Sequence, residues 1–125
     1  MTLALLLFGC WTAVVEPGLE SFRTACASWK PYAAYVRSVR WCMPIECENM
    51  QVGNMFAEYR DRNEIVVSRV VPEDMLDLTL VHEYGHALGL QHLPVGIMKK
   101  DWTPPVADGP EQSDFDAIAR LWRAR

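Results

Sequence analysis

The sequence is poor in positive charge, in repetition and in histidine, and the first two shortages exclude whole classes of protein. It carries 12 Lys and Arg against 16 Asp and Glu, a net charge of −4, so it lacks the basic surface that nucleic-acid phosphates require. It has no long run of one charge, no low-complexity tract and no internal repeat, which argues against a charged tail or a solenoid. Its 125 residues, half of them apolar, predict one domain with its own core.

The N-terminal residues 1–16 are apolar but lack the features of a membrane-spanning helix. Residues 2–15 carry no charge, yet they are too few to cross a bilayer, which takes about 20 residues. They have the length of a signal-peptide core without its positive start, and residues 7–10 resemble a bacterial lipoprotein box ending in Cys10. We therefore predict a signal peptide or lipoprotein signal, and a bacterial or phage protein that is secreted or attached to a membrane through this end. A buried first strand is the alternative.

Cysteine is scarce, with four residues at positions 10, 26, 42 and 47. Cys42 and Cys47 flank Pro44 and could close a short loop in an oxidising compartment. A zinc knuckle is the alternative use of this pair, but the sequence has no second pair of ligands to complete it. Cys26 falls on the apolar face of a predicted helix, where we expect it to be simply buried.

From residue 17 onwards the pattern predicts a single α+β domain, residues 17–125. Apolar residues at helical spacing, β-branched runs and capping residues mark its elements. In order, these are a helix over 17–29, a strand over 35–41, a connection over 42–49, a hairpin of strands 51–60 and 64–68, a helix over 72–88, a loop, and a last helix capped by Ser113 or Asp114.

All three histidines of the chain lie within residues 82–92. His82 and His86 are four residues apart, which puts both side chains on one face of a helix, at the spacing that two ligands of one zinc ion need. Gly89 ends the helix and lets the chain reverse, so that His92 can return to the same metal. Three protein ligands leave a fourth position open, which is typical of catalytic zinc.

Glu83 follows the first histidine and is the predicted general base. Zinc lowers the pKa of a bound water to about 7 and polarises a substrate carbonyl, and Glu83 would take the proton and pass it to the departing amine. Because only neutral imidazole binds metal, activity should fall in acid. Surface histidines on an amphipathic helix, with an ordinary glycine cap, are the alternative, but the extended motif is far more specific than its first five residues.

The sequence HEYGHALGLQH at 82–92, followed by Gly96-Ile97-Met98, resembles the metzincin clan of zinc endopeptidases, and within it the matrixin-like catalytic domains. The resemblance extends more loosely over residues 18–125. It implies a small zincin domain with a mixed sheet, an active-site helix, a Met-turn and a C-terminal helix. In that scheme one catalytic zinc ion is held by His82, His86 and His92, Glu83 is the base, and Met98 is the hydrophobic floor beneath the metal.

The resemblance also implies a substrate site and shows some departures. Residues 51–57 would form an edge strand on which an extended peptide lies. The sequence has no second His/Asp cluster for structural zinc, no Gly/Asp-rich loop for calcium and no counterpart of the astacin tyrosine ligand. We therefore expect a minimal, monomeric zinc endopeptidase that acts on a peptide or protein. A zinc-dependent peptide-binding module without turnover, disfavoured by the intact Glu83, and a hydrolase of a non-peptide amide are the alternatives.

Overall fold

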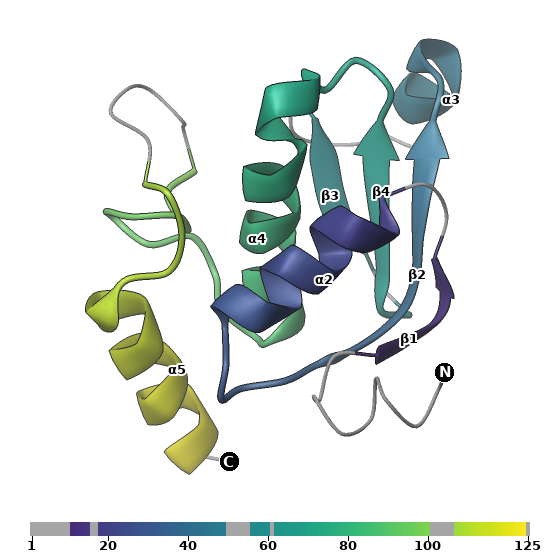
Figure 1. Ribbon diagram of the computed structural model, residues 1–125. Coiled ribbons are helices and arrows are strands. Elements are labelled where there is room, and N and C mark those ends of the chain that lie inside the picture. The colour runs from purple at the N-terminus through teal and green to yellow at the C-terminus, as the bar shows by residue number, and fades with distance from the viewer. Residues whose placement is uncertain (1–10, 16–17, 50–55, 61, 101–106, 125) are drawn as a thin grey trace.

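A computed structural model of the protein describes residues 11–15, 18–49, 56–60, 62–100 and 107–124 and confirms the α+β class (Figure 1). The short 3₁₀ helix η1 leads directly into the helix that carries the first two histidines. The elements, in chain order, are β1 (Trp11–Val15), α2 (Leu19–Ser28), β2 (Tyr35–Cys42), α3 (Pro44–Asn49), β3 (Ala57–Arg60), β4 (Glu64–Ser68), η1 (Glu73–Met75), α4 (Leu76–Ala87) and α5 (Gln112–Arg123).

The strands form one mixed sheet in the order β1-β2-β4-β3. β2 is parallel to both β1 and β4, whereas β3 and β4 form the predicted antiparallel hairpin. The turn of this hairpin includes Arg62 and Asn63, with φ values of 69° and 58°, a left-handed conformation that asparagine adopts more readily than most residues. Of the predicted strand 51–60, the described part begins as β3 at Ala57, and residues 50–55 lie outside the described residues.

β1 lies within residues 1–16, which the sequence predicts to be an export signal. Trp11 pairs with Tyr35 and Val15 with Val39. Residues 11–15 therefore form a first strand, as the alternative interpretation of this segment predicted. A lipoprotein signal ending at Cys10 would leave β1 in the mature chain, and residues 1–10 lie outside the described residues. Export and lipid attachment therefore stay predictions. Among the described residues, no helix combines the length and apolarity needed to cross a bilayer.

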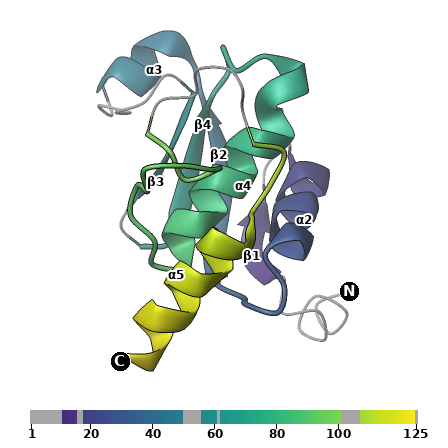
Figure 2. The same cartoon turned by 90° about the vertical axis from the view of Figure 1, so that its left-hand side faces the viewer.

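Helices α2 and α4 pack on the same face of the sheet, and Figure 2 shows α4 in front of the strands with α2 beside it. The predicted apolar face of α2 is confirmed, because Phe22, Cys26 and Trp29 are all buried. Cys26 is also disulfide-bonded, so the expectation of a simple buried thiol was wrong. A periodic pattern shows which face of a helix is buried, but it does not show which sulfur atoms meet.

Two hydrogen bonds from buried aromatic side chains fix α4 in place. The indole Nε1–H of Trp29 donates to the carbonyl of Val81 at 2.8 Å. The hydroxyl of Tyr84 accepts the backbone N–H of Ala34 at 2.8 Å, and its ring lies 5.8 Å from that of Phe22. Because buried polar groups are costly when unpaired, these bonds favour one rotation of α4 about its axis, and hence one direction for its histidines.

The connection predicted over residues 42–49 contains a short helix, α3, and that prediction was wrong. Pro44 occupies the first helical position, where its missing N–H costs nothing. The carboxylate of Glu46 accepts the backbone N–H of Met43 at 3.2 Å, which satisfies a group that the helix leaves unpaired. The proline and the glutamate two residues after it were the signals of this helix in the sequence.

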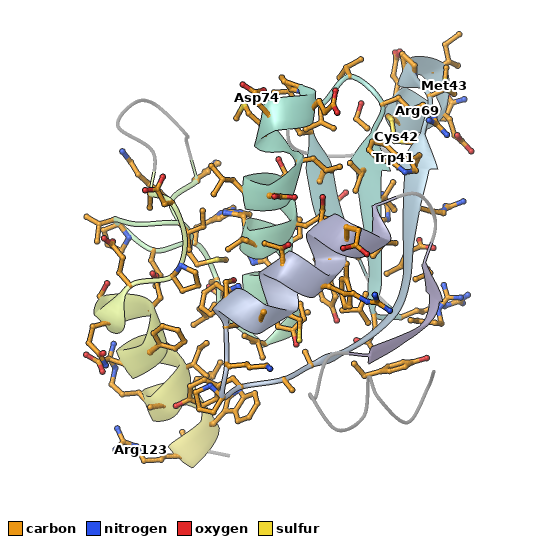
Figure 3. All side chains as sticks on the ribbon, in the orientation of Figure 1. Trp41, Cys42, Met43, Arg69, Asp74 and Arg123 are labelled. Atoms are coloured by element: carbon orange, nitrogen blue, oxygen red, sulfur yellow. A yellow bond between two sulfur atoms is a disulfide. The ribbon has the colours of Figure 1, made fainter. Side chains whose placement is uncertain are left out.

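The predicted loop closure by Cys42 and Cys47 is confirmed as a disulfide with a Cα–Cα distance of 5.2 Å. Both sulfur-bearing residues are buried with Val66 on the face of the sheet opposite α4. Figure 3 shows Cys42 where β2 ends beside α3, and Arg123 of α5 at the other end of the molecule. The bridge therefore lies at the end of the sheet that is remote from α5.

The last helix, α5, starts two residues earlier than a cap at Ser113 would allow. Its N-cap is Glu111, and Asp114 is the third helical residue, whose carboxylate accepts the backbone N–H of Glu111 at 2.8 Å. Ser113 is exposed inside the first turn. The expectation that Ser113 or Asp114 would cap the helix was wrong because the aspartate satisfies the N-terminal N–H groups from inside the helix.

The face of α5 that packs on the core includes Ile118, which is fully buried, and Phe115 and Trp122, which are partly buried. The ring of Tyr32 contacts both aromatic side chains, at centroid distances of 6.4 Å to Phe115 and 5.1 Å to Trp122. The indole of Trp122 donates to the carbonyl of Leu88 at 3.0 Å. α5 therefore holds the C-terminal end of α4, where the third histidine follows.

Candidate metal centre

The three histidines predicted as ligands come together. One nitrogen atom from each of His82, His86 and His92 lies within 4.8 Å of the others, and these form the sole such cluster of three or more metal-ligating groups among the described residues. The ring centroids are 4.9 Å apart for the pairs that include His86 and 5.4 Å apart for His82 and His92. These three side chains could jointly hold a metal ion.

The chain reverses after α4 in a way that brings the third histidine back. α4 ends at Ala87, and Gly89 follows with a φ of 108°. The N–H of Leu90 donates to the carbonyl of Gly85 at 3.1 Å, and the N–H of Gly89 donates to that of His86 at 3.0 Å. These are the two bonds of a Schellman motif, which needs a left-handed residue and so favours glycine. The segment beyond carries His92 to the cluster from outside the helix.

Two backbone carbonyls orient the helical histidines. Nδ1 of His82 lies 2.6 Å from the carbonyl oxygen of Ile97, and Nδ1 of His86 lies 2.8 Å from that of Leu90. A carbonyl oxygen can only accept, so each Nδ1 carries the proton and each Nε2 keeps its lone pair. The two Nε2 atoms lie 3.2 Å apart. Two lone pairs at this distance repel each other unless a proton or a cation lies between them.

The three histidines differ in burial, and burial keeps His82 and His86 neutral. His82 is buried, His86 is partly buried and His92 is exposed, so the cluster is open to solvent on the side of His92. The pKa of His82 is lowered to about 4, mainly by burial, while the Ile97 hydrogen bond opposes this shift and the neighbouring histidines add to it. Burial likewise lowers the pKa of His86. Both rings are therefore in the neutral, metal-binding form at pH 7.

Glu83 lies on the same helix, 3% exposed, and its Oε1 has no hydrogen-bond partner among the described residues. The pKa of Glu83 is raised to about 7, mainly by burial, while a hydrogen bond with the backbone of Tyr59 opposes this shift and the charge of Glu58 adds to it. Tyr59 belongs to β3, so the edge strand of the sheet lies directly beside this carboxylate. A carboxyl group that titrates near neutrality is suited to accepting and returning a proton.

Met98, predicted as the floor of the site, is fully buried and lies against Gly85 of α4. A Cβ built on Gly85 would overlap the sulfur of Met98 and lie 2.9 Å from Trp29. Gly96 turns the chain ahead of it with a φ of 83°, and the N–H of Leu93 donates to the carbonyl of Met98 at 3.0 Å. The methionine therefore packs under the helical turn between the first two histidines.

Sequence reasoning missed the groups that orient the histidines and the glutamate. These groups are the carbonyls of Ile97 and Leu90 and the backbone of Tyr59. Every residue carries the same backbone groups, so no residue type marks them. The one available signal was indirect, since a ligating histidine almost always donates its second N–H to some acceptor.

The arrangement supplies three imidazoles for a metal ion, one buried carboxylate beside them and an opening to solvent. No protein-family model and no curated protein matches the chain in sequence comparisons.

Proposed function

We propose that this protein is a zinc-dependent endopeptidase of the metzincin type, with His82, His86 and His92 as zinc ligands and Glu83 as general base. The observation that carries the proposal is the pair of Nε2 lone pairs held 3.2 Å apart by two carbonyls, with the third histidine beside them. Such an arrangement is unfavourable by itself and is satisfied by a shared cation.

Zinc fits the donor set. Two nitrogen atoms that bind one tetrahedral zinc at about 2.0–2.1 Å lie about 3.3 Å from each other, close to the 3.2 Å between His82 and His86. Three neutral imidazoles without a carboxylate or thiolate are the ligand set of several catalytic zinc sites. Each helical ligand also has the second hydrogen bond that fixes its ring in such sites.

Each residue of the site has a separate role in the proposed reaction. Zinc, when bound, supplies a Lewis acid that acidifies water and polarises a carbonyl group. Glu83 accepts the proton of the attacking water at its free Oε1 and delivers it to the nitrogen of the leaving amine. The hydrogen bond with the backbone of Tyr59 on β3 holds the carboxylate beside the edge strand of the sheet. Met98 supports the turn of α4 that carries the ligands.

A peptide is the substrate that the neighbouring strand favours. β3 is at one edge of the sheet and pairs with β4 alone among the described residues. An extended peptide can add to such an edge through main-chain hydrogen bonds, and Glu83 lies beside it. Of the predicted substrate strand 51–57, residues 51–55 lie outside the described residues, so this part of the proposal rests on β3.

The test is cleavage of a peptide library by purified, zinc-loaded protein, together with measurement of bound zinc. We expect a single zinc ion per chain and cleavage that is lost after chelation, regained with zinc, and lost in Glu83→Gln with zinc retained. Glu73→Gln, an exposed glutamate at the start of η1, is the matched control and should cleave normally. Failure to retain zinc at neutral pH would refute the proposal. Bound zinc without cleavage of any peptide would favour a binding module, or a hydrolase of a non-peptide amide if such a substrate is cleaved.

A further inference from the structure

Thr79 extends the polar face of α4 by one turn. It lies three residues before His82 and four before Glu83, and residues at these spacings share one face of a helix. With His86, the four residues occupy positions i, i+3, i+4 and i+7. Thr79 is 3% exposed, so this hydroxyl is buried beside the proposed catalytic residues and takes no part in the mechanism described above.

The hydroxyl of Thr79 has no hydrogen-bond partner within the described part of the chain. A threonine inside a helix usually donates to the carbonyl four residues earlier, and Thr79 makes no such bond. The Oε1 atom of Glu83 is buried and unpartnered in the same way. An unused donor and an unused acceptor therefore lie one helical turn apart on one face.

The direction of helical side chains brings the two groups towards each other. Long side chains lean towards the N-terminus of their helix and cover the preceding turn, so we expect the side chain of Glu83 to lean towards Thr79. No direct hydrogen bond joins them. Because β-carbons at this spacing lie about 5–6 Å apart, we expect the hydroxyl and carboxylate oxygen atoms to be near enough for one water to bridge, and a buried water is stable where it meets two or more polar atoms.

No second pair of this kind occurs among the described residues. Nε of Arg40 on β2 contacts the carboxylate of Glu64 at 3.2 Å. Oδ1 of Asp114 lacks a hydrogen bond, but Asp114 is on α5. Thr79 and Glu83 are thus the two unpartnered groups that share one helix face.

We propose that Thr79 is a positioning residue for Glu83. The hydroxyl of Thr79 donates to a buried water, and this water donates to Oε1 of the Glu83 carboxylate. Because the role assigned to Glu83 is itself proposed, this inference rests on the proposed function. The bridge fixes the position of Oε1 while the Tyr59 backbone holds the carboxylate from β3. The hydroxyl touches neither the metal nor the substrate.

Thr79→Val tests the bridge because it keeps the shape of the side chain and removes the hydroxyl. We expect kcat to fall about five- to tenfold, the scale of one ordinary hydrogen bond, with KM and zinc content unchanged. The acid limb of the pH profile should move to higher pH, since the carboxylate loses a donor. Thr79→Ser keeps the hydroxyl and should restore most of the rate. Thr24→Val, at an exposed position of α2, is the matched control.

A second measurement does not depend on turnover. The urea midpoints of wild type, Thr79→Val, Glu83→Ala and the double variant form a cycle in the zinc-loaded protein. A bridge predicts that the two changes are not additive, whereas an isolated hydroxyl predicts additivity and a Thr79→Val protein at least as stable as wild type.

The outcomes separate the two proposals. Normal cleavage by wild type, with an active Thr79→Val and an additive cycle, overturns the bridge and leaves the function standing. Loss of zinc from Thr79→Val also overturns it, because the residue would then support the fold of the site. No cleavage by wild type with a non-additive cycle refutes the function but supports the bridge.

Discussion

Met98 and Gly85 are in such close contact that α4 has no room for a β-carbon between its two histidines. A Cβ on Gly85 would overlap the methionine sulfur and lie 3.1 Å from its terminal methyl group. Gly85 comes three residues after His82 and one before His86. The contact between Met98 and Gly85 therefore limits how closely the segment after Gly89 can pack on α4.

Gly85→Ala should disturb the site through this contact. Overpacking a buried position typically costs about 1–3 kcal/mol of unfolding free energy, and we expect a loss in that range by urea denaturation. Zinc affinity should also fall, because Ile97, next to Met98, accepts the hydrogen bond of His82. Gly109→Ala is the matched control, since nothing lies within 4 Å of a Cβ there. Equal stability of the two variants would contradict the close contact.

Trp122→Phe should weaken the attachment of α5 to the end of α4. The variant keeps an aromatic ring against Tyr32 but loses the N–H that bonds the Leu88 carbonyl at 3.0 Å. Leu88 is the C-cap residue of α4, and its carbonyl has no helical partner, so we expect a loss of about 1 kcal/mol in unfolding free energy. Arg123→Ala, exposed on the same helix, should leave stability unchanged, and a similar loss in both variants would argue against the hydrogen bond.

The parts of the site that could be predicted depend on side-chain spacing along one helix. His82 and His86 had to share a face once residues 76–87 were helical, and Gly89 marked the reversal that returns His92. The carbonyls of Ile97 and Leu90 could not be predicted, because their positions depend on how the segment after Gly89 packs on α4. Thr79 was overlooked because a lone threonine in an apolar run indicates nothing until its burial is known.

The fold was predictable to a similar extent, and its errors were local. The hairpin and both core helices follow from apolar periodicity and β-branched runs, which report burial averaged over many residues. The short helix α3 and the cap of α5 depend on single hydrogen bonds, those of Glu46 and Asp114. Such bonds are decided by which carboxylate reaches which N–H group, and several choices were compatible with the sequence.

Removing the Cys42–Cys47 bridge should cost stability without affecting the metal site. The bridge closes a loop of five residues' separation, for which loop-closure entropy gives about 2 kcal/mol. Because it lies on the face of the sheet opposite α4, the Cys42→Ser, Cys47→Ser variant should bind zinc with unchanged affinity. Isothermal titration with zinc and urea denaturation check the two parts separately. A tenfold loss of zinc affinity would show that the two ends of the sheet are coupled.

Glu83→Gln should stabilise the metal-free protein at alkaline pH and have little effect in acid. The folded-state pKa of Glu83 is about 7 against an ordinary 4.5, so between these values the folded state binds a proton that the unfolded state has released. Stability therefore falls as pH rises from 4.5 to 7, and the full cost applies above 7. The difference of about 2.5 pH units corresponds to a cost on the order of 3–4 kcal/mol, which the neutral glutamine avoids.

The effect of His82 on stability has the opposite pH dependence, but it is the same in wild type and variant and so cancels from the comparison. Its folded-state pKa is about 4 against 6.5, so its contribution is present above pH 6.5 and is lost as pH falls towards 4, in wild type and variant alike. Urea midpoints of chelated wild type and Glu83→Gln at pH 5 and pH 8 isolate the glutamate, with Glu73→Gln as the exposed control. A gain of the same size at both pH values would mean that the carboxylate is ionised throughout, and that burial does not hold it near neutrality for proton transfer.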